Sequence, residues 1–148
     1  MRRKMVGISL LLLVLLAAVS VSLTVLFSGG YERIIGLNWD LDLPRSSGCL
    51  YETDSGASPH GDGFRYHVLE YAPGSGLAAA LEEQTEECAP AECGAAFIWD
   101  GLSVPADWRP DPAQCRCFTK AHPSDSRNEL WLLLSADGTR LYAAESFL

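Results

Sequence analysis

Residues 129–147 read ELWLLLSADGTRLYAAESF, and this stretch decides the fold. Two apolar runs, 129–135 and 140–147, flank the dipeptide Asp137-Gly138. Asp-Gly between two apolar runs is among the strongest short-range signals for a β-hairpin, because these residues tolerate the positive φ angles that tight turns need. We therefore expect an antiparallel pair of strands at this end of the chain.

A second hairpin is predicted earlier in the chain. Residues 64–72, FRYHVLEYA, form a strand pattern in which even-numbered and odd-numbered positions lie on opposite faces. Residues 49–53, CLYET, also have the composition of a strand. The ten residues between them, DSGASPHGDG at 54–63, are mostly turn formers. The two strands are expected to pair around a long tip.

One helix is predicted in the middle of the chain. Residues 77–87, LAAALEEQTEE, are rich in strong helix formers, and Ser75 is placed to cap the N-terminus of the helix. Leu77 and Leu81 lie on its short apolar stripe. Four glutamates toward the C-terminal end are expected to form a solvated helix face: Glu82, Glu83, Glu86 and Glu87.

Three further segments carry weaker patterns. Residues 31–43 predict a helical turn that leads into an extended segment, which Pro44 stops. Residues 94–104 contain the apolar run AAFIW and predict a buried strand or another core segment, and residues 115–122 predict a strand. Together these patterns indicate the α+β class, with one small antiparallel sheet and one packed helix.

The N-terminal region predicts a membrane anchor. Val6–Phe27 contains no charged residue, and a helix of this length reaches roughly 33 Å, enough to cross the ~30 Å hydrocarbon core of a bilayer. Basic residues at positions 2–4 precede it, whereas Glu32 and Arg33, the first charges after it, cancel. This bias keeps the N-terminus in the cytoplasm and sends residues 31–148 outside.

A cleaved signal peptide is the alternative interpretation of this segment. Ala18-Val19-Ser20 and Ser20-Val21-Ser22 offer the small residues of a cleavage site. The apolar run nevertheless continues to Phe27, past both sites, where a cleavage region turns polar. We expect a single-pass signal anchor and short linker in residues 1–30 and an extracytoplasmic domain in residues 31–148, which is secreted if the segment is cleaved.

The charge of the exported part argues against two classes of partner. Without the three basic residues at positions 2–4, 8 lysines and arginines face 19 acidic residues, a net charge of −11. Nucleic acid and anionic lipid headgroups both require basic patches. The partners expected are therefore the bilayer itself, through residues 6–27, and an envelope or membrane protein, but no nucleic acid.

The cysteines predict disulfides, because all of them lie on the exported side, where such bonds persist. The odd count leaves at least one cysteine unpaired, and 15 connectivities remain for two bridges. Cys88 to Cys93 is the easiest local bridge, and a four-thiolate zinc site is the alternative, although neither close pair has the usual two-residue gap. The five candidates are Cys49, Cys88, Cys93, Cys115 and Cys117.

The loop at 54–63 is the candidate binding site. His60 and Asp62 lie in its glycine-bracketed tip, and they would form a metal site only if further ligands such as Asp54 converged on them. A plain turn is the alternative, in which the glycines supply positive φ angles. Trp108, in a proline-rich loop, is a further binding candidate. No residue is assigned as catalytic, cofactor-binding or metal-ligating, since the sequence has no G-x-S-x-G elbow and no phosphate loop.

The same loop carries a resemblance to a known group of proteins. Asp54 and His60-Gly61-Asp62-Gly63 match a loop of the form D-T-H-G-G-F-H-G-D-G that precedes a strand. In these features the chain resembles small membrane-anchored extracytoplasmic proteins of Gram-positive bacteria. The resemblance implies an exported α+β domain behind a membrane segment and no known activity.

The rest of the resemblance is looser. Trp99 and Val104-Pro105 correspond to a tryptophan near a Leu-Pro segment, and the Asp137-Gly138 hairpin fits as well. Gly56 stands in place of the group's first histidine and Pro59 in place of its phenylalanine. A site that uses that first histidine is therefore not carried over.

The function expected from the sequence is non-enzymatic binding at the cell surface by a membrane-anchored domain. The anchor, the acidic exterior and the missing catalytic motifs favour this hypothesis. One alternative is a metal-dependent envelope enzyme that uses the loop with His60 and Asp62. Another is a structural subunit of a membrane complex, held through residues 6–27.

Overall fold

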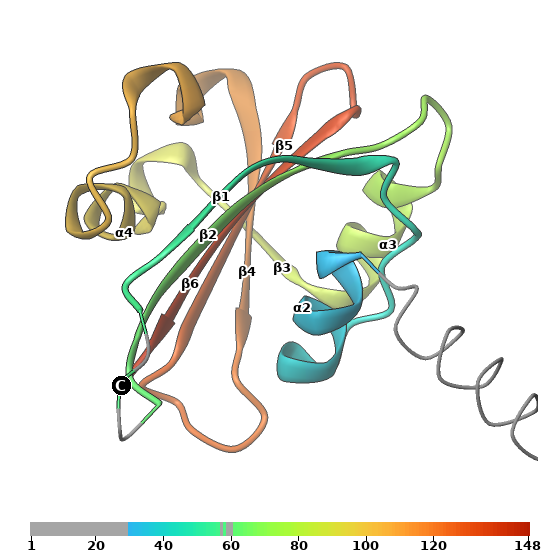
Figure 1. The fold of residues 1–148 in the computed structure, drawn as a ribbon. Coiled ribbons are helices and arrows are strands. Elements are labelled where there is room, and N and C mark those ends of the chain that lie inside the picture. The colour runs from blue at the N-terminus through green and yellow to red at the C-terminus, as the bar shows by residue number, and fades with distance from the viewer. Residues whose placement is uncertain (1–29, 57, 59–60) are drawn as a thin grey trace, which may run out of the picture.

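The computed structural model describes residues 30–56, 58 and 61–148. They form one six-stranded antiparallel sheet with helices on both faces, in the strand order β1-β2-β6-β5-β4-β3 (Figure 1). The predicted anchor at 6–27 lies outside the described residues. In the described part of the chain, no helix has both the length and the apolar character needed to span a membrane.

The α+β class and the single antiparallel sheet are confirmed. Each pair of neighbouring strands runs antiparallel. The strands are β1 Gly48–Asp54, β2 Gly63–Glu70, β3 Glu86–Cys88, β4 Cys115–Ala121, β5 Glu129–Ser135 and β6 Arg140–Phe147.

Both predicted hairpins are confirmed. β5 and β6 begin and end where the apolar runs do, and Gly138 in their turn has φ 70°. Asp137 fixes this turn, because its carboxylate accepts hydrogen bonds from Ser135 Oγ at 2.6 Å and from the Thr139 N–H at 3.1 Å. β1 pairs with β2 along its length, with a register shift between Cys49 and Tyr51.

The alternation along the strands divides the core into two layers. The opposite faces predicted for the even-numbered and odd-numbered positions of residues 64–72 belong to different layers. Leu69 on β2 and Leu141 on β6 lie in one layer, whereas Tyr66 and Val68 lie in the other. Because successive side chains of a strand point to opposite faces, a sheet with apolar residues at both parities must be covered on both sides.

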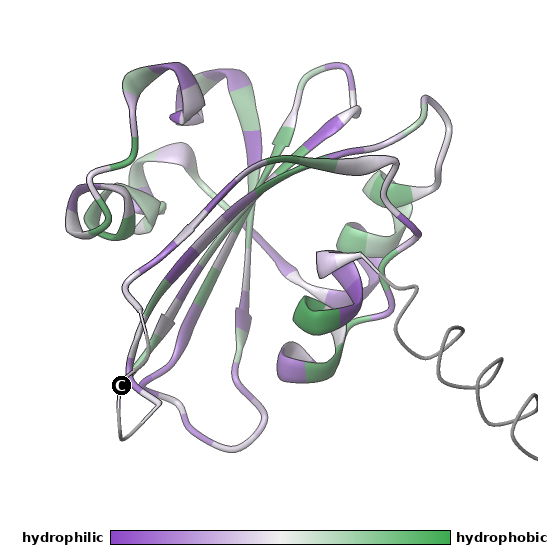
Figure 2. Ribbon diagram, viewed as in Figure 1, coloured by the Kyte–Doolittle hydropathy of each residue, from purple (hydrophilic) through white to green (hydrophobic). Residues whose placement is uncertain are grey.

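The first layer lies beneath two helices, α2 Tyr31–Trp39 and α3 Leu77–Gln84. Ile35 on α2 and Leu81 on α3 are buried against the sheet. Figure 2 shows green, apolar segments in both of these helices. The predicted helical turn at 31–43 is thus a longer helix, which ends at Trp39 and is followed by Asp40 with φ 53° and then by an extended segment.

The second layer lies beneath α4 Ala95–Gly101. For residues 94–104 the sequence predicted either a buried strand or another core segment. The prediction of a core segment is confirmed and that of a strand is wrong. Ala95, Ile98 and Trp99 are the buried residues of α4, and their spacing of three and four places them on one helix face. The prediction of one packed helix is therefore also wrong, because α2 and α3 cover one face and α4 the other (Figure 1).

The predicted helix at 77–87 is shorter than expected. α3 begins after Gly76, which occupies the N-cap position predicted for Ser75. Gly76 has φ 83°, a left-handed conformation that residues with a Cβ adopt only at a cost. α3 ends at Gln84, and Glu86 and Glu87 belong to β3. The four glutamates therefore do not form one helix face.

Three short 3₁₀ turns complete this second face. They are η1 Pro90–Glu92, η2 Ala106–Trp108 and η3 Pro112–Gln114.

Candidate functional site

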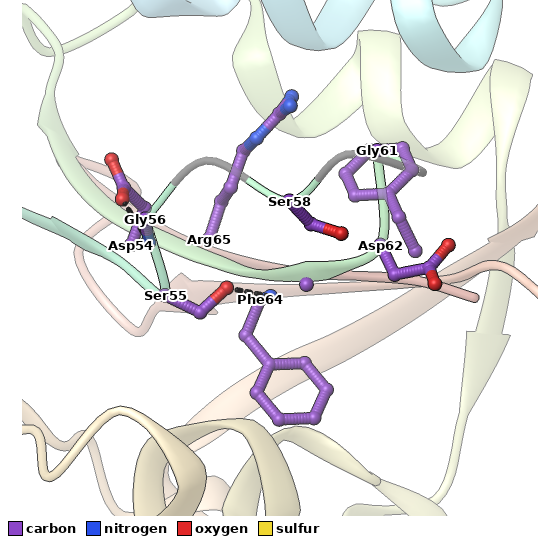
Figure 3. A pocket seen from close by; sticks show the side chains of 10 residues that line it. Asp54, Ser55, Gly56, Ser58, Gly61, Asp62, Phe64 and Arg65 are labelled. Carbon is purple, nitrogen blue, oxygen red and sulfur yellow. Dashed lines mark hydrogen bonds between the residues drawn. The ribbon is translucent and has the colours of Figure 1, made fainter.

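The loop between β1 and β2 forms the wall of a surface hollow of about 250 Å³ (Figure 3). β1 ends at Asp54 and β2 begins at Gly63, so the hairpin itself places the loop at one end of the sheet. Figure 3 shows Phe64 and Arg65 leaving β2 in opposite directions. The lining residues are Asp54, Ser55, Gly56, Ser58, Gly61, Asp62, Gly63, Phe64, Arg65 and Phe147.

Hydrogen bonds within the loop fix its start and its end. Asp54 Oδ1 accepts the Gly56 N–H at 2.6 Å, and Ser55 Oγ accepts the Phe64 N–H at 2.9 Å. Gly61 and Gly63 have φ angles of 81° and 145°, as the turn interpretation predicts. The Asp54 carboxylate thus stabilises the start of the loop by a hydrogen bond to its backbone.

The candidate metal ligands of this loop are only partly described. Asp62 is exposed in the loop, and its charge interacts with that of Arg127. His60 lies outside the described residues, so the loop's possible metal site stays a prediction. Within the described ranges, no three or more His, Cys, Asp or Glu side chains are arranged to hold a metal ion.

Two further hollows adjoin the first one. Asp54 and Arg65 also line a hollow of about 490 Å³ between α2 and the ends of β1 and β2. Gly61, Asp62 and Phe147 also line a hollow of about 550 Å³ that reaches residues 124–128. We call the three together the hollow strip, and the predicted binding loop forms its centre.

A buried polar cluster lies where α2 meets the sheet. Glu145, on β6, is fully buried and accepts hydrogen bonds from Tyr31 Oη at 2.6 Å and from Trp39 Nε1 at 2.7 Å. Burial and the neighbouring Glu145 raise the pKa of Tyr31, so its hydroxyl keeps its proton and remains a donor. This cluster joins both ends of α2 to one carboxylate.

Glu145 is not among the site residues predicted from the sequence, although the pattern of β6 contains a sign of it. Leu141, Ala143 and Glu145 share one parity of β6, and the first two face the core. A glutamate at the parity of core residues indicates a buried carboxylate with partners on the covering helix.

His67 lies next to this cluster and also faces α2. Its ring stacks on Tyr31 with an interplanar angle of 12°, and its Nε2 is 3.8 Å from a Glu52 carboxylate oxygen. Burial, with a smaller contribution from the charge of Arg65, lowers the pKa of His67 to about 4. His67 is therefore neutral at neutral pH, and it lines the hollow beside α2 as an uncharged group.

Trp108 is not brought together with the loop. It ends η2, stacks on Tyr51 at a centroid distance of 5.2 Å and packs against the α4 layer. Its carbonyl accepts a hydrogen bond from Tyr66 Oη at 2.5 Å. The structure thus gives Trp108 a packing role on the opposite face, and it lines none of the three hollows of the strip.

The five cysteines are free thiols in the structure, so the predicted disulfides stay a prediction. Cys49 is exposed on β1. The other four pack in the layer beneath α4: Cys88, Cys93, Cys115 and Cys117.

Comparisons with protein-family models, with curated proteins and with solved structures found no match for this chain. The geometry of the site therefore carries the functional argument alone. The hollow strip brings acidic, basic and aromatic side chains together along one open surface.

Proposed function

We propose that this protein is a membrane-tethered domain outside the cytoplasm that binds a segment of a partner protein without catalysing a reaction. Residues 6–27 are its anchor, and the hollow strip is its contact surface. The basic residues at positions 2–4, with charges that cancel at Glu32 and Arg33 after the apolar run, support this orientation.

The observation that carries the proposal is the position of β1. It is the outermost strand at one edge of the sheet, where it pairs with β2 alone among the described strands. Its last three residues, Glu52, Thr53 and Asp54, line the hollow beside α2. An extended peptide that adds to β1 gains main-chain hydrogen bonds along the edge, and its side chains enter the hollow.

The side chains of the strip favour a ligand that carries both apolar and charged groups. Arg65 lies over the Phe147 ring, 4.7 Å from its centroid, between two of the hollows. Asp54 provides a negative charge beside it, and Ile34 of α2 leaves 45% of its surface exposed at the rim. A polypeptide segment supplies such mixed groups, whereas nucleic acid supplies a uniform negative charge.

Site-specific photo-crosslinking in intact membranes tests the proposal. A benzophenone amino acid replaces Ile34, at the rim of the hollow strip, or Phe97, an exposed apolar residue on α4. We expect a discrete protein adduct from position 34 and none from position 97. The same adducts from both positions, or none from position 34, would contradict the proposal.

Charge variants sharpen this test. Arg65→Glu is expected to remove the adduct at position 34, because it reverses the charge between two hollows. Arg140→Glu is the matched control, since Arg140 is exposed and its strand position is at the far end of β6. Arg65→Gln removes the charge without reversing it and is expected to reduce the yield of the adduct at position 34. This variant provides the test if Arg65→Glu unfolds the domain.

A further inference from the structure

α2 has an apolar side that the rest of the domain leaves uncovered. Ile35 and Trp39 are fully buried against the sheet, whereas Leu37 leaves 77% of its surface exposed and Ile34 leaves 45%. Among the large apolar side chains of the described residues, that of Leu37 has the largest exposed fraction. Adjoining apolar side chains on the surface of a folded domain indicate a contact with another molecule or with a membrane.

The exposed side chains of α2 lie together on one side of the helix. Leu37 follows Arg33 by four residues and Ile34 by three, and residues with these spacings are neighbours on a helix surface. We call these three residues the outer face of α2. Ile34 also lines the hollow beside α2, but Leu37 lines none of the three hollows of the strip. The hollow strip therefore does not account for the exposure of Leu37.

The outer face begins close to the predicted anchor. Residues 28–30 separate Phe27, at the end of the apolar run, from Tyr31, the first residue of α2. An extended chain gains at most ~3.5 Å per residue, so the two Cα atoms lie within about 14 Å of each other. The polar layer of a bilayer is about 5–8 Å thick on each side. With Phe27 at the edge of the hydrocarbon core, α2 begins in this layer or within about 10 Å, one helix width, of it.

We propose that the outer face of α2 lies against the lipid bilayer that anchors the chain, with Leu37 and Ile34 inserted among the headgroups. The inference rests on the anchor of the proposed function and adds a second membrane contact, made by the folded domain itself. Helices that lie in an interface place apolar side chains on the membrane side and basic ones beside them, as Leu37, Ile34 and Arg33 are placed here.

The tether favours the bilayer over a second copy of the chain as the occupant of this face. Residues 28–30 hold the bilayer within reach of α2, so a contact of few side chains forms as an intramolecular event at a high effective concentration. A second copy must first diffuse to the same place, and residues 31–148 of each copy carry a net charge of −11. The same charge favours neutral lipids over anionic ones, because the apolar side chains and not a basic patch make the contact.

The contact determines which face of the sheet is turned toward the membrane. α2 and α4 cover opposite faces of the sheet (Figure 1). Phe97 on α4 leaves 67% of its surface exposed, and in this orientation it faces the water. Position 97 is therefore a matched control for position 37, since both are exposed apolar positions on helices.

Quenching of a fluorescent probe in vesicles tests the proposal. A fluorescent amino acid replaces Leu37 or Phe97 in the full chain, which is reconstituted in phosphatidylcholine vesicles. One quencher is a phosphatidylcholine with a nitroxide near the headgroup end of its acyl chain, and the other is a neutral water-soluble nitroxide on both sides of the bilayer. We expect the lipid nitroxide to quench position 37 more strongly than position 97, and the soluble nitroxide to do the reverse. Use of one probe at both positions controls for the affinity of the probe itself for lipid.

Variants at position 37 test the contact with the probe placed at position 34. Leu37→Glu is expected to reduce quenching by the lipid nitroxide, because a carboxylate on the outer face must remain in water. Leu37→Ser removes the apolar group without adding a charge and is expected to reduce it as well. Phe97→Glu is the control and should leave the quenching unchanged. Circular dichroism of each variant checks that the domain remains folded.

The outcomes separate this inference from the proposed function. Flotation shows first whether the chain is anchored, and a chain that does not float with the vesicles overturns the anchor and the inference together. An anchored chain in which the soluble nitroxide is the stronger quencher of position 37 overturns the inference alone. Shielding of position 37 from both quenchers also overturns it, because a second copy or another protein then covers the outer face. Equal lipid quenching at positions 37 and 97 would refute the orientation and with it the inference.

Discussion

Glu145 connects α2 to the sheet through a single buried carboxylate. Its two donors, Tyr31 and Trp39, come from the first and last residues of α2. A carboxylate that accepts two hydrogen bonds is adequately paired in the interior, and removing it leaves two buried donors without a partner.

We predict that Glu145→Ala lowers the free energy of unfolding by about 3 kcal/mol, because unpaired buried donors and a cavity both destabilise the fold. Glu145→Gln is expected to cost less, since its carbonyl still accepts one of the two bonds. Urea unfolding of the full chain in detergent, followed by tryptophan fluorescence, measures both. The control, Glu129→Ala on exposed β5 surface, should change stability by less than about 0.5 kcal/mol. Equal effects at positions 129 and 145 would contradict this role.

His67 gives the domain a pH-dependent stability. Its pKa of about 4 lies below the ordinary value of 6.5, so between these values the unfolded chain binds a proton that the folded chain does not. The contribution of His67 to stability is complete above pH 6.5 and is lost as the pH falls toward 4. Burial is the main cause of the lowered pKa of His67, the charge of Arg65 lowers it further, and the charge of Asp54 opposes this. A Glu52 carboxylate oxygen lies 3.8 Å from His67 Nε2.

We predict that His67→Gln removes up to about 3 kcal/mol of the stability change between pH 7 and pH 4, because the variant has no imidazole to protonate. Denaturant midpoints at several pH values measure the slope. Above about pH 7 the imidazole is neutral in both the folded and the unfolded state. The difference in stability between wild type and variant should therefore not change between pH 7 and pH 8. Parallel slopes of wild type and variant between pH 4 and 6.5 would refute the prediction.

At the scale of elements, the long strands were predictable, whereas the short helix α4 and the short strand β3 were not. β2, β5 and β6 carry alternation or flanking turn residues that fix their ends, and Gly138 marks their tightest turn. The AAFIW run of α4 is too short for its periodicity to separate a strand from a helix. β3 has three residues, two of them glutamates, and only its pairing with β4 makes it a strand.

We predict that Gly138→Ala destabilises the domain by about 1 kcal/mol, because φ 70° is unfavourable for a residue with a Cβ. The surroundings are open, with no atom near the added Cβ, so conformational strain is the only cost. Gly48→Ala is the matched control, since its site is equally open and its φ is not in the left-handed region. Thermal unfolding of both variants measures the difference, and an equal loss in the two would contradict the assignment.

The two-sided covering of the sheet is a property of the whole molecule that local patterns could not supply. The parity of core residues shows that both faces are apolar, yet which helix covers which face depends on the order of the strands in space. The candidate site, too, could be predicted from local sequence patterns only in part. The loop at 54–63 was recognisable from its turn residues, whereas the hollow beside α2 exists only because Tyr31 and Ile34 pack next to β1 and β2.

The location of the domain is tested with its own exposed thiol. Cys49 is exposed on β1, so we predict that a membrane-impermeant maleimide labels it in intact cells at pH 8. Burial of part of its surface and the charge of Glu52 raise the pKa of Cys49, which makes labelling faster at alkaline pH. Cys49→Ala should lose this label. Labelling only after the cells are opened would contradict the proposed orientation.

The central position of β6 has a consequence for biosynthesis. β2 and β5 are joined through β6, which is formed by residues 140–147 and therefore leaves the ribosome after both of them. The hairpin of β1 and β2 must therefore wait, with one edge open, until residues 140–147 have been synthesised. In an exported chain this delay makes the nascent hairpin a natural client for a chaperone on the receiving side of the membrane.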